Sequence, residues 1–372
     1  MSRVPLSVLD LVPVSAGSNA SEALHNTVDL AREAEAAGYA RYWLAEHHLN
    51  PGVAGSAPNL VMGAVAAATS SIRVGSAATL VGNVRALQIV EAFGTLVGLH
   101  GPRFDLGLGR SGAPAPGTGV RPPAPATAAA RSDEVVDGLV VPAPFPFRVA
   151  PGSRFALQGE LLGRVPGDVD RFADELTTIR AFLAGTFERD GVVVEATPAS
   201  RPDSAPELWI HGSTGGESAR IAGSLGLPYG ANYHSSPGTV LDSVRAYREA
   251  FRPGVLDAPH VVVSADVVVA DTDTEATRLG RGYGAWVHSI RSGVGAIPYP
   301  SPEDAPELPD DLVVTVADRL ATRFVGAPEH VVERLATLRR VIGADELLVT
   351  TITHAHDARV RSYRLLADAW GA

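Results

Sequence analysis

Two kinds of hydrophobic pattern alternate along the chain. Short apolar segments predict buried β-strands, and longer segments in which apolar residues recur at helical spacing predict helices with one buried face. The strands are expected at residues 4–12, 41–46, 72–81, 103–109, 207–212, 227–232, 261–270 and 345–351. The helices are expected at residues 20–37, 60–68, 87–99, 169–183, 217–225, 239–251, 274–287, 311–324, 328–341 and 358–370.

The order of these elements predicts the fold class. A regular alternation of strand and helix is typical of a parallel α/β sheet, and eight strands in 372 residues favour a closed (β/α)8 TIM barrel. A doubly wound open sheet is the alternative fold. No segment has the composition of a linker between domains, so residues 1–372 are expected to form a single domain.

Two stretches interrupt this alternation. Residues 112–167 are rich in Pro, Ala and Gly, and residues 292–309 also lack a regular pattern. Proline fixes φ and has no amide donor, so the Pro-rich tracts 113–130 and 140–151 are not expected to form helices. Both stretches are expected to be irregular insertions at the C-terminal mouth of the barrel, where they would cover a site as lids.

A literal G-x-G-x-x-G occurs in residues 104–116, at Gly107, Gly109 and Gly112. A dinucleotide site also requires a helix that begins inside the motif and an acidic residue about 20 positions later. Prolines follow the motif at once, and the nearest acidic residues lie beyond them. We therefore interpret the glycines as the end of a barrel strand whose backbone lies close to another group, with Arg110 projecting into the mouth.

Two adjacent histidines follow the second expected strand, in Glu46-His47-His48. Because side chains alternate along a strand, one histidine is expected to point into the mouth and the other toward the helices. The alternative is that both are structural, with a hydrogen bond to a backbone carbonyl. A metal site is not expected, since the later strand ends carry no clear cluster of His and Asp.

Small residues mark two further strand ends. Residues 75–78 interrupt the third strand, which indicates either tight packing against a helix or a flat ligand pressed on the backbone. Residues 211–218 join the fifth strand to a helix and are rich in Gly, Ser and Thr. Such a turn is either an ordinary capped loop or an anion site suited to a monophosphate, because free amides and the positive end of the helix dipole meet there.

Composition excludes several classes of protein. The formal net charge of −10, from 31 basic and 41 acidic residues, does not favour binding to nucleic acid. The chain has no Cys, which excludes disulfides, thiolate metal sites and Cys nucleophiles. The N-terminus lacks the apolar segment of a signal peptide, and no run approaches the roughly 20 apolar residues that span a membrane. We therefore expect a cytoplasmic protein that does not bind a membrane.

Five motifs, taken in order, resemble the bacterial-luciferase-like family of flavin-dependent oxidoreductases. They are LAEHH at 44–48, IRVGSAATLVGN at 72–83, GPRFDLGLGR at 101–110, HGSTGGESARIAGSLGLPYG at 211–230 and FVGAPEHVVERL at 324–335. The resemblance covers most of the chain and fails mainly in the Pro-rich insertion. The sequence also departs from the family after the third strand, where residues 80–84 lack the Pro and His of many relatives, and this bears on the substrate.

The resemblance implies roles for particular residues. The family binds FMN at the C-terminal mouth of a (β/α)8 barrel, and His47 matches the histidine placed near the reactive flavin ring. The pair Ala77 and Ala78 matches a non-proline cis peptide beside the ring, and Arg110 resembles the arginine on the phosphate side. The residues that correspond to the loop around the FMN phosphate are Thr214, Gly215 and Ser218.

The resemblance also implies a reaction. Many members are monooxygenases that receive reduced FMN (FMNH2) from a separate NAD(P)H-dependent flavin reductase and insert one atom of O2 into a substrate through a flavin C4a-(hydro)peroxide. We expect a small hydrophobic substrate, such as an aromatic polyketide or another natural product, and a homodimer. The alternatives are a flavin- or deazaflavin-dependent dehydrogenase, a non-catalytic flavin-binding protein, and a metal-dependent barrel hydrolase.

Overall fold

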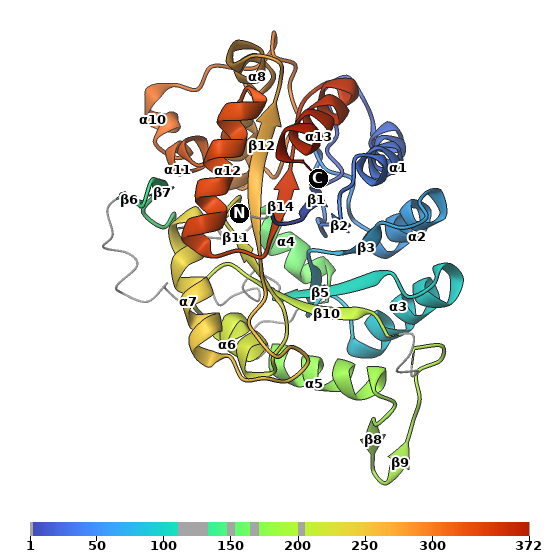
Figure 1. The fold of residues 1–372 in the computed structure, drawn as a ribbon. Coiled ribbons are helices and arrows are strands. Elements are labelled where there is room, and N and C mark those ends of the chain that lie inside the picture. Colours follow the sequence, from blue (N-terminus) through green and yellow to red (C-terminus); the bar gives the residue numbers. More distant parts are fainter. Residues whose placement is uncertain (1–2, 111–132, 147–152, 164–170, 200–204, 372) are drawn as a thin grey trace.

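The computed structural model describes residues 3–110, 133–146, 153–163, 171–199 and 205–371, and its centre is a closed barrel of parallel strands (Figure 1). The barrel strands are β1 (Leu6–Asp10), β2 (Arg41–Leu44), β3 (Arg73–Ser76), β5 (Phe104–Arg110), β10 (Glu207–Gly212), β11 (Tyr229–Asn232), β12 (Val261–Val269) and β14 (Glu346–Thr350). Their order is β10-β11-β12-β14-β1-β2-β3-β5, and pairing of β5 with β10 closes the ring. The predicted (β/α)8 barrel is confirmed, and an open doubly wound sheet is excluded by this closing pair.

Helices cover the outside of the barrel (Figure 1). The helices that pack there are α1 (Ala20–Ala36), α2 (Pro58–Ala68), α3 (Ala86–His100), α5 (Phe172–Leu183), α6 (Glu217–Ser224), α7 (Val240–Ala250), α12 (Pro328–Ile342) and α13 (His356–Trp370). Each lies within a few residues of its expected range. The side chain of Asn19 accepts a hydrogen bond from the Glu22 amide at 3.1 Å and begins α1, which satisfies one of the free amides at the helix start.

Two of the expected helices were wrong in extent. The segment 274–287 forms two helices, α8 (Asp273–Leu279) and α9 (Tyr283–Arg291), separated at Gly280 and Gly282. The segment 311–324 forms only the short helices α10 (Asp310–Val313) and α11 (Ala317–Ala321), followed by strand β13 (Phe324–Gly326). Strand β12 is long enough to continue beyond the barrel, so its free edge pairs with β13.

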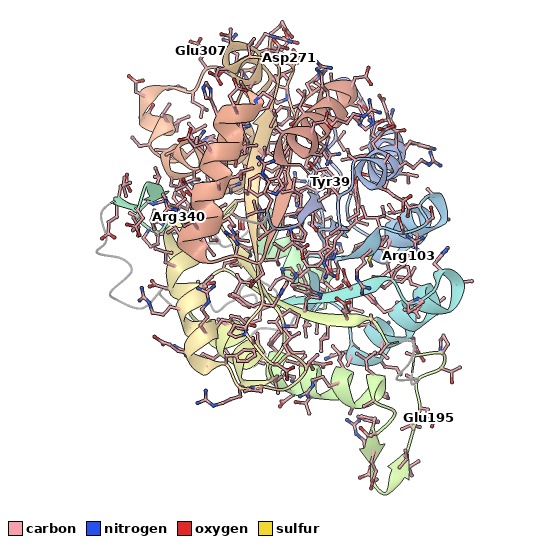
Figure 2. The ribbon with its side chains drawn as sticks, viewed as in Figure 1. Tyr39, Arg103, Glu195, Asp271, Glu307 and Arg340 are labelled. Atoms are coloured by element: carbon pink, nitrogen blue, oxygen red, sulfur yellow. The ribbon has the colours of Figure 1, made fainter. Side chains whose placement is uncertain are left out.

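The Pro-rich insertion contains more regular structure than the sequence predicted. Strands β6 (Glu134–Val136) and β7 (Leu139–Val141) form a hairpin, and α4 (Arg154–Leu161) is a helix whose first turn is capped by Ser153. The expectation of an irregular segment is therefore wrong for these residues. The tract 113–130 lies outside the described residues. In Figure 2, Arg340 of α12 lies beside the hairpin, where it donates to the Asp137 carbonyl at 2.9 Å.

A second hairpin, β8 (Glu188–Arg189) and β9 (Val192–Val193), extends away from the barrel before Glu195 (Figures 1 and 2). Both hairpins turn at an Asp-Gly pair with positive φ: 48° and 88° at Asp137 and Gly138, and 54° and 76° at Asp190 and Gly191. Asp-Gly is the pair that a two-residue hairpin turn favours, because both positions must adopt positive φ.

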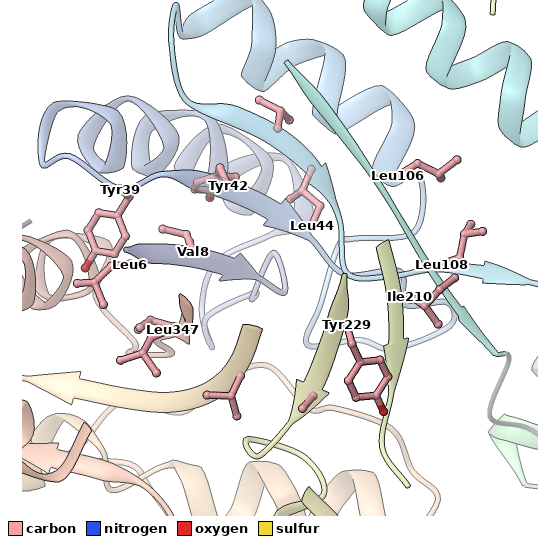
Figure 3. Close-up of a cluster of buried hydrophobic side chains, with 14 of the residues drawn as sticks. Leu6, Val8, Tyr39, Tyr42, Leu44, Leu106, Leu108, Ile210, Tyr229 and Leu347 are labelled. Atoms are coloured by element: carbon pink, nitrogen blue, oxygen red, sulfur yellow. The ribbon is translucent and has the colours of Figure 1, made fainter. Parts of the chain in front are cut away.

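Side chains along each barrel strand alternate between two cores. One core lies between strands and helices, and Figure 3 shows some of its members: Leu6, Val8, Tyr42, Leu44, Leu106, Leu108, Ile210, Tyr229 and Leu347. The other core fills the barrel interior with Leu9, Trp43, Trp209, Val262 and Leu348. Two residues of one barrel strand that lie an even number of positions apart therefore point to the same side of the barrel wall.

A network of charges closes the N-terminal end of the barrel. Arg41 donates to the carboxylates of Asp105 at 2.7 Å and Glu346 at 3.2 Å, and Arg73 also binds Asp105 at 2.6 Å. Asp105 is fully buried, and the Trp43 indole donates to it at 2.8 Å. Because this end is filled, the C-terminal mouth is the end at which a site can form. Within the described segments, no helix has the length and apolar character that crossing a bilayer requires.

Candidate active site at the barrel mouth

His47 follows strand β2 at the mouth. Trp43 and Ala45 belong to the interior core, so the two-residue period of the strand directs His47 to the same side. Its backbone amide donates to the Gly55 carbonyl at 3.0 Å, which holds the loop. Its Nδ1 atom is buried and has no hydrogen-bond partner among the described residues. Burial lowers the pKa of His47 to about 4, although the neighbouring Glu46 opposes this effect, so the ring is neutral at pH 7.

Glu46 organises the surroundings of His47. Its buried carboxylate accepts hydrogen bonds from the Leu80 amide at 2.9 Å and from the Asn83 side chain at 2.7 Å. The ring of His48 contacts the same carboxylate at 3.0 Å. The two histidines are thus distinguished: His48 is held by Glu46, whereas Nδ1 of His47 has no partner within the described chain.

The peptide bond between Ala77 and Ala78 is cis, as the family resemblance implied. It separates β3 from the short strand β4 (Thr79–Val81), and the Ala77 amide donates to the Leu44 carbonyl at 2.9 Å at the end of β2. A Cβ atom at Gly109 would lie 3.0 Å from the Cβ of Ala78, so strand β5 passes close by. His47, this peptide and the end of β5 therefore follow one another around the mouth.

The glycines of the G-x-G-x-x-G sequence are explained by strand packing. A Cβ atom at Gly107 would lie only 1.8 Å from the Ser76 carbonyl oxygen, which confirms that the backbone there lies close to another group. Gly112 is outside the described residues.

Arg110 ends β5, and its guanidinium contacts Glu217, the first residue of α6, at 3.3 Å. The structure thus brings Arg110 to the start of the helix that follows the expected anion loop. In this loop, a Cβ atom at Gly215 would lie 2.9 Å from the Asp242 carbonyl oxygen, and Ser218 is buried in the first turn of α6. Among the residues that the structure describes, no side chain caps the α6 N-terminus, so its first amides are available to an anion. That Arg110, Thr214, Gly215 and Ser218 bind a phosphate remains a prediction.

The second irregular stretch packs on the loops that follow β1 and β2. Tyr299 is fully buried, its amide donates to the Val14 carbonyl at 2.8 Å, and its carbonyl accepts from the Ala16 amide at 2.8 Å. The Ala296 amide donates to the side chain of Asn50 at 2.9 Å. Residues 292–309 therefore lie at the mouth, although their action as a lid remains a prediction.

The Pro-rich insertion reaches the same region through its described residues. The guanidinium of Arg291, at the end of α9, lies 3.7 Å from the centre of the Phe145 ring. Arg154 of α4 donates to the Leu49 carbonyl at 2.5 Å, close to His47 in the chain. Within the Pro-rich insertion, α4 thus contacts the loop after β2, and Phe145 contacts the end of α9, directly before residues 292–309.

Two histidines of the barrel interior were missed by the sequence analysis. His211 is the second-to-last residue of β10, is buried, and meets Trp43 edge to face at a ring separation of 5.3 Å. Burial lowers its pKa to about 4, and its Nε2 has no partner in the described parts of the chain. His234 follows β11, and its Nδ1 contacts the Ser264 hydroxyl at 2.6 Å. The two-residue period of β10 was the available signal for His211, since it places that ring on the same side as Trp209 of the interior core, whereas His234 lies in the turn after β11 and had no such signal.

Asp266 lies two residues after Ser264 on β12 and is part of a buried polar cluster. Its carboxylate accepts hydrogen bonds from the Tyr283 hydroxyl and from Arg319, the latter at 3.2 Å. Arg319 also donates to the Tyr283 oxygen at 2.7 Å. The negative charge of Asp266 is therefore balanced inside the mouth.

Two cavities of about 310 and 300 Å³ flank the β6–β7 hairpin, on the sides of α12 and α7 respectively. Neither is lined by His47, Ala77, Ala78 or Arg110.

Known proteins resemble this chain over nearly its whole length. The family model for luciferase-like monooxygenases matches residues 4–140 and 153–346. The uncharacterized protein YvbT of Bacillus subtilis (strain 168) is 35% identical over 372 residues, 98% of this chain and 96% of that protein. A luciferase-like monooxygenase of Escherichia coli (strain K12) is 30% identical and covers 98% and 96% of the two chains. The crystal structure of apo-MsnO8 superposes with a TM-score of 0.76 at 30% identity, covering 99% and 98%.

More distant structures share the fold alone. The oxygenating constituent of 3,6-diketocamphane monooxygenase from Pseudomonas putida, in complex with FMN, has a TM-score of 0.61 at 17% identity and covers 98% of this chain and 97% of its own. An F420-dependent secondary alcohol dehydrogenase, with an F420–acetone adduct, has a TM-score of 0.60 at 13% identity and covers 99% of both. The family match, the full-length relatives and the closed barrel agree: the chain belongs to the luciferase-like monooxygenase family of enzymes.

Proposed function

We propose that the protein is an FMNH2-dependent monooxygenase that transfers one oxygen atom of O2 to a hydrophobic organic substrate. One observation carries the proposal: His47, the Ala77–Ala78 peptide, Arg110 and the start of α6 follow one another around one side of the mouth, on consecutive strand ends from β2 to β10. The relatives named luciferase-like monooxygenase support oxygenation rather than hydride transfer.

The residues of this arc suit the parts of FMN. Small residues line the cis peptide and the end of β5, which leaves backbone surface against which a flat ring can lie. A buried ring nitrogen at His47, which has no partner among the described residues, suits a polar edge of the isoalloxazine. At the other end of the arc, the α6 N-terminus and Arg110 provide amides and positive charge for the phosphate, with Thr214, Gly215 and Ser218 in the turn.

Bound reduced FMN would supply the electrons that activate O2. The chain's own contribution is to position the ring, exclude water and control protons. Since the pKa of His47 is about 4, its neutral ring can donate a hydrogen bond from one nitrogen and accept at the other without adding charge. Residues 292–309, packed on the loops after β1 and β2, support the exclusion of water that such chemistry requires.

The proposal includes a separate NAD(P)H-dependent flavin reductase as the source of reduced FMN, and a homodimer as the assembly. Close contacts with β3 and Ala78 explain Gly107 and Gly109, so these glycines do not indicate a dinucleotide site for NAD(P)H. Purified protein is therefore expected to oxidise NADH only slowly until a reductase and FMN are added, and sedimentation is expected to give twice the chain mass of 38.7 kDa.

Titration with FMN, riboflavin and F420 tests the cofactor assignment. The wild-type protein is expected to bind FMN more tightly than riboflavin, because only FMN carries a phosphate. Arg110→Ala is expected to weaken FMN binding about tenfold, the effect of one charge-assisted hydrogen bond, and to leave riboflavin binding unchanged. Equal losses for both flavins would contradict the placement of the phosphate, and preference for F420 would favour the dehydrogenase.

Oxygen dependence tests the reaction. With a generic reductase and a set of hydrophobic compounds that includes polycyclic aromatic natural products, product is expected to contain one oxygen atom from 18O2. Turnover that continues without O2 would contradict oxygenation. His47→Ala is expected to keep FMN binding largely and to lose product formation; full activity in this variant would remove His47 from the reaction.

A further inference from the structure

We propose that His234 is a second histidine of the active site, which selects the substrate by accepting a hydrogen bond from a hydroxyl group on an otherwise apolar molecule. This inference rests on the proposed function, because it places the substrate in the same mouth. It adds a residue that the family resemblance did not suggest, and it specifies a hydroxyl group on the expected hydrophobic substrate.

The topology places His234 opposite His47. In the order of the ring, three strands separate β11 from β2 in either direction: β12, β14 and β1 on one side, and β10, β5 and β3 on the other. Strands so separated in an eight-stranded barrel lie across its axis from each other. A direct interaction between residues at these two strand ends therefore passes through the mouth itself.

Ser264 places the ring of His234 next to that space. Gly230 of β11 faces the interior, where an added Cβ would meet the ring of His211 at 2.1 Å, and His234 lies in the turn that follows β11. Nδ1 of His234 contacts Ser264, whose inward position on β12 follows that of Val262. The charge on a protonated His47 also lowers the pKa of His234, although burial has the larger effect.

Ser264 determines how the ring of His234 is presented. The hydroxyl of Ser264 is buried, lies 2.6 Å from Nδ1 of His234 and has the Ala231 carbonyl as an acceptor at 3.4 Å, an arrangement in which it can accept Nδ1–H of His234. The ring is neutral at pH 7, since burial lowers its pKa to about 4, and Nε2 then carries the free lone pair. Among the described residues, no hydrogen bond to Nε2 is formed.

The charges around His234 keep it in this state. Asp266 lies two residues along β12 and raises the pKa of His234, while Arg319 lowers it. Asp266 is already bound by Arg319 and Tyr283, which balances its charge. A neutral acceptor, rather than a charged group, therefore faces the mouth, and its natural partner is a neutral donor such as a phenol or enol hydroxyl.

The interior core, which contains mainly apolar side chains, favours an apolar body on the same molecule. Trp286, Tyr299 and Ile352 belong to the interior core that also contains Trp43 and are at most 4% exposed. An apolar ring system with one hydroxyl matches a site of this kind, where few polar groups determine orientation.

Two fluorescent probes that differ in one methyl group test the inference: 2-naphthol, which donates a hydrogen bond, and 2-methoxynaphthalene, which does not. The wild-type protein is expected to bind 2-naphthol about fivefold more tightly, the effect of one hydrogen bond. His234→Leu is expected to abolish this preference, and Ser264→Ala to reduce it by releasing the ring. The matched control is His354→Leu at another strand end, because Nε2 of His354 is already bonded to the Ala16 carbonyl at 2.9 Å.

A second measurement is made on the wild-type protein and needs a variant only to assign the His234 signal. Nitrogen NMR of 15N-histidine protein, with His234→Gln for assignment, is expected to show His234 protonated at Nδ1 and free at Nε2, and to show a change at Nε2 when 2-naphthol is added. Protonation at Nε2 instead, or a probe preference that survives His234→Leu, would overturn the inference. FMN titration in the same samples distinguishes the two proposals. If the wild-type protein does not bind FMN, the proposed function is refuted. If it binds FMN but does not prefer 2-naphthol over 2-methoxynaphthalene, only the role of His234 is refuted.

Discussion

Substitution of Gly107 by Ala tests the contact on which the geometry of the mouth depends. The new Cβ would lie 1.8 Å from the Ser76 carbonyl oxygen and 2.8 Å from Nε2 of His211. To reach ordinary contact at 3.4 Å, β3 and β5 would have to separate by about 1.6 Å. Backbone on one side and a buried ring on the other leave no flexible group that could move aside.

The expected cost follows from two effects of this separation. Overpacking of a dense interior costs about 1–3 kcal/mol. The hydrogen bond from the Ser76 hydroxyl to the Gly107 carbonyl, 2.9 Å long, would also be lost, at about 1 kcal/mol. Gly107→Ala is therefore expected to lower the free energy of unfolding by about 2–4 kcal/mol. It should also weaken FMN binding, because β3 leads directly into the Ala77–Ala78 peptide.

Urea unfolding followed by circular dichroism measures the change, with Gly98→Ala as the matched control. Gly98 lies on α3, and a Cβ there would approach Pro198 no closer than 3.8 Å. This control is expected to gain about 0.5–1 kcal/mol, since Ala favours the helix over Gly. If Gly107→Ala unfolded within about 0.5 kcal/mol of the wild type, an amount typical of surface substitutions, the argument from strand proximity would be refuted.

Three further predictions concern buried and titrating groups. Asp10→Asn should lower the free energy of urea unfolding by about 3–5 kcal/mol, because it leaves Arg359 without a counter-charge, and Arg359 is almost fully buried and bonded to Asp10 at 2.6 Å. The double variant with Arg359→Met should recover part of this loss. If the losses of the two single variants simply added in the double variant, the pairing would be contradicted. Partial burial raises the pKa of Glu35, but hydrogen bonds from the amides of residues 70–72 have the larger effect and lower this pKa to about 2. The ionised Glu35 therefore stabilises the fold above the unfolded pKa of 4.5, and this contribution is lost as the pH falls toward 2. Glu35→Gln should therefore cost about 1 kcal/mol at pH 7, given its exposure, and nothing near pH 2; an equal loss at both values would refute this. Since the pKa of His47 is about 4, the activity that depends on it should stay constant from pH 8 to pH 6 and fall only as the ring becomes protonated below pH 5, which a pH profile of product formation would check.

Errors in the sequence analysis arose where local signals were present but not used. Asp137-Gly138 follows two valines and Asp190-Gly191 precedes two, and an Asp-Gly pair next to such residues is the usual indication of a tight hairpin, which both form. Gly280 and Gly282 marked the break in the helix expected at 274–287. By contrast, β13 had no local signal, because its pairing with β12 depends on the unpaired edge that β12 leaves beyond the barrel.

Periodicity and strand ends alone determined the fold class, the eight barrel strands and the placement of His47 and Arg110 at the mouth. These are local properties, since a side chain's direction follows from the two-residue period of its own strand. Only the tertiary structure decided which residues meet. The placement of His47 and His234 at strand ends across the ring, the support of His234 by Ser264, and the burial of Asp266 between Tyr283 and Arg319 depend on how the strands close into a ring. Residues far apart in the sequence become neighbours across the axis only through closure, and no pattern within a single strand contains that information.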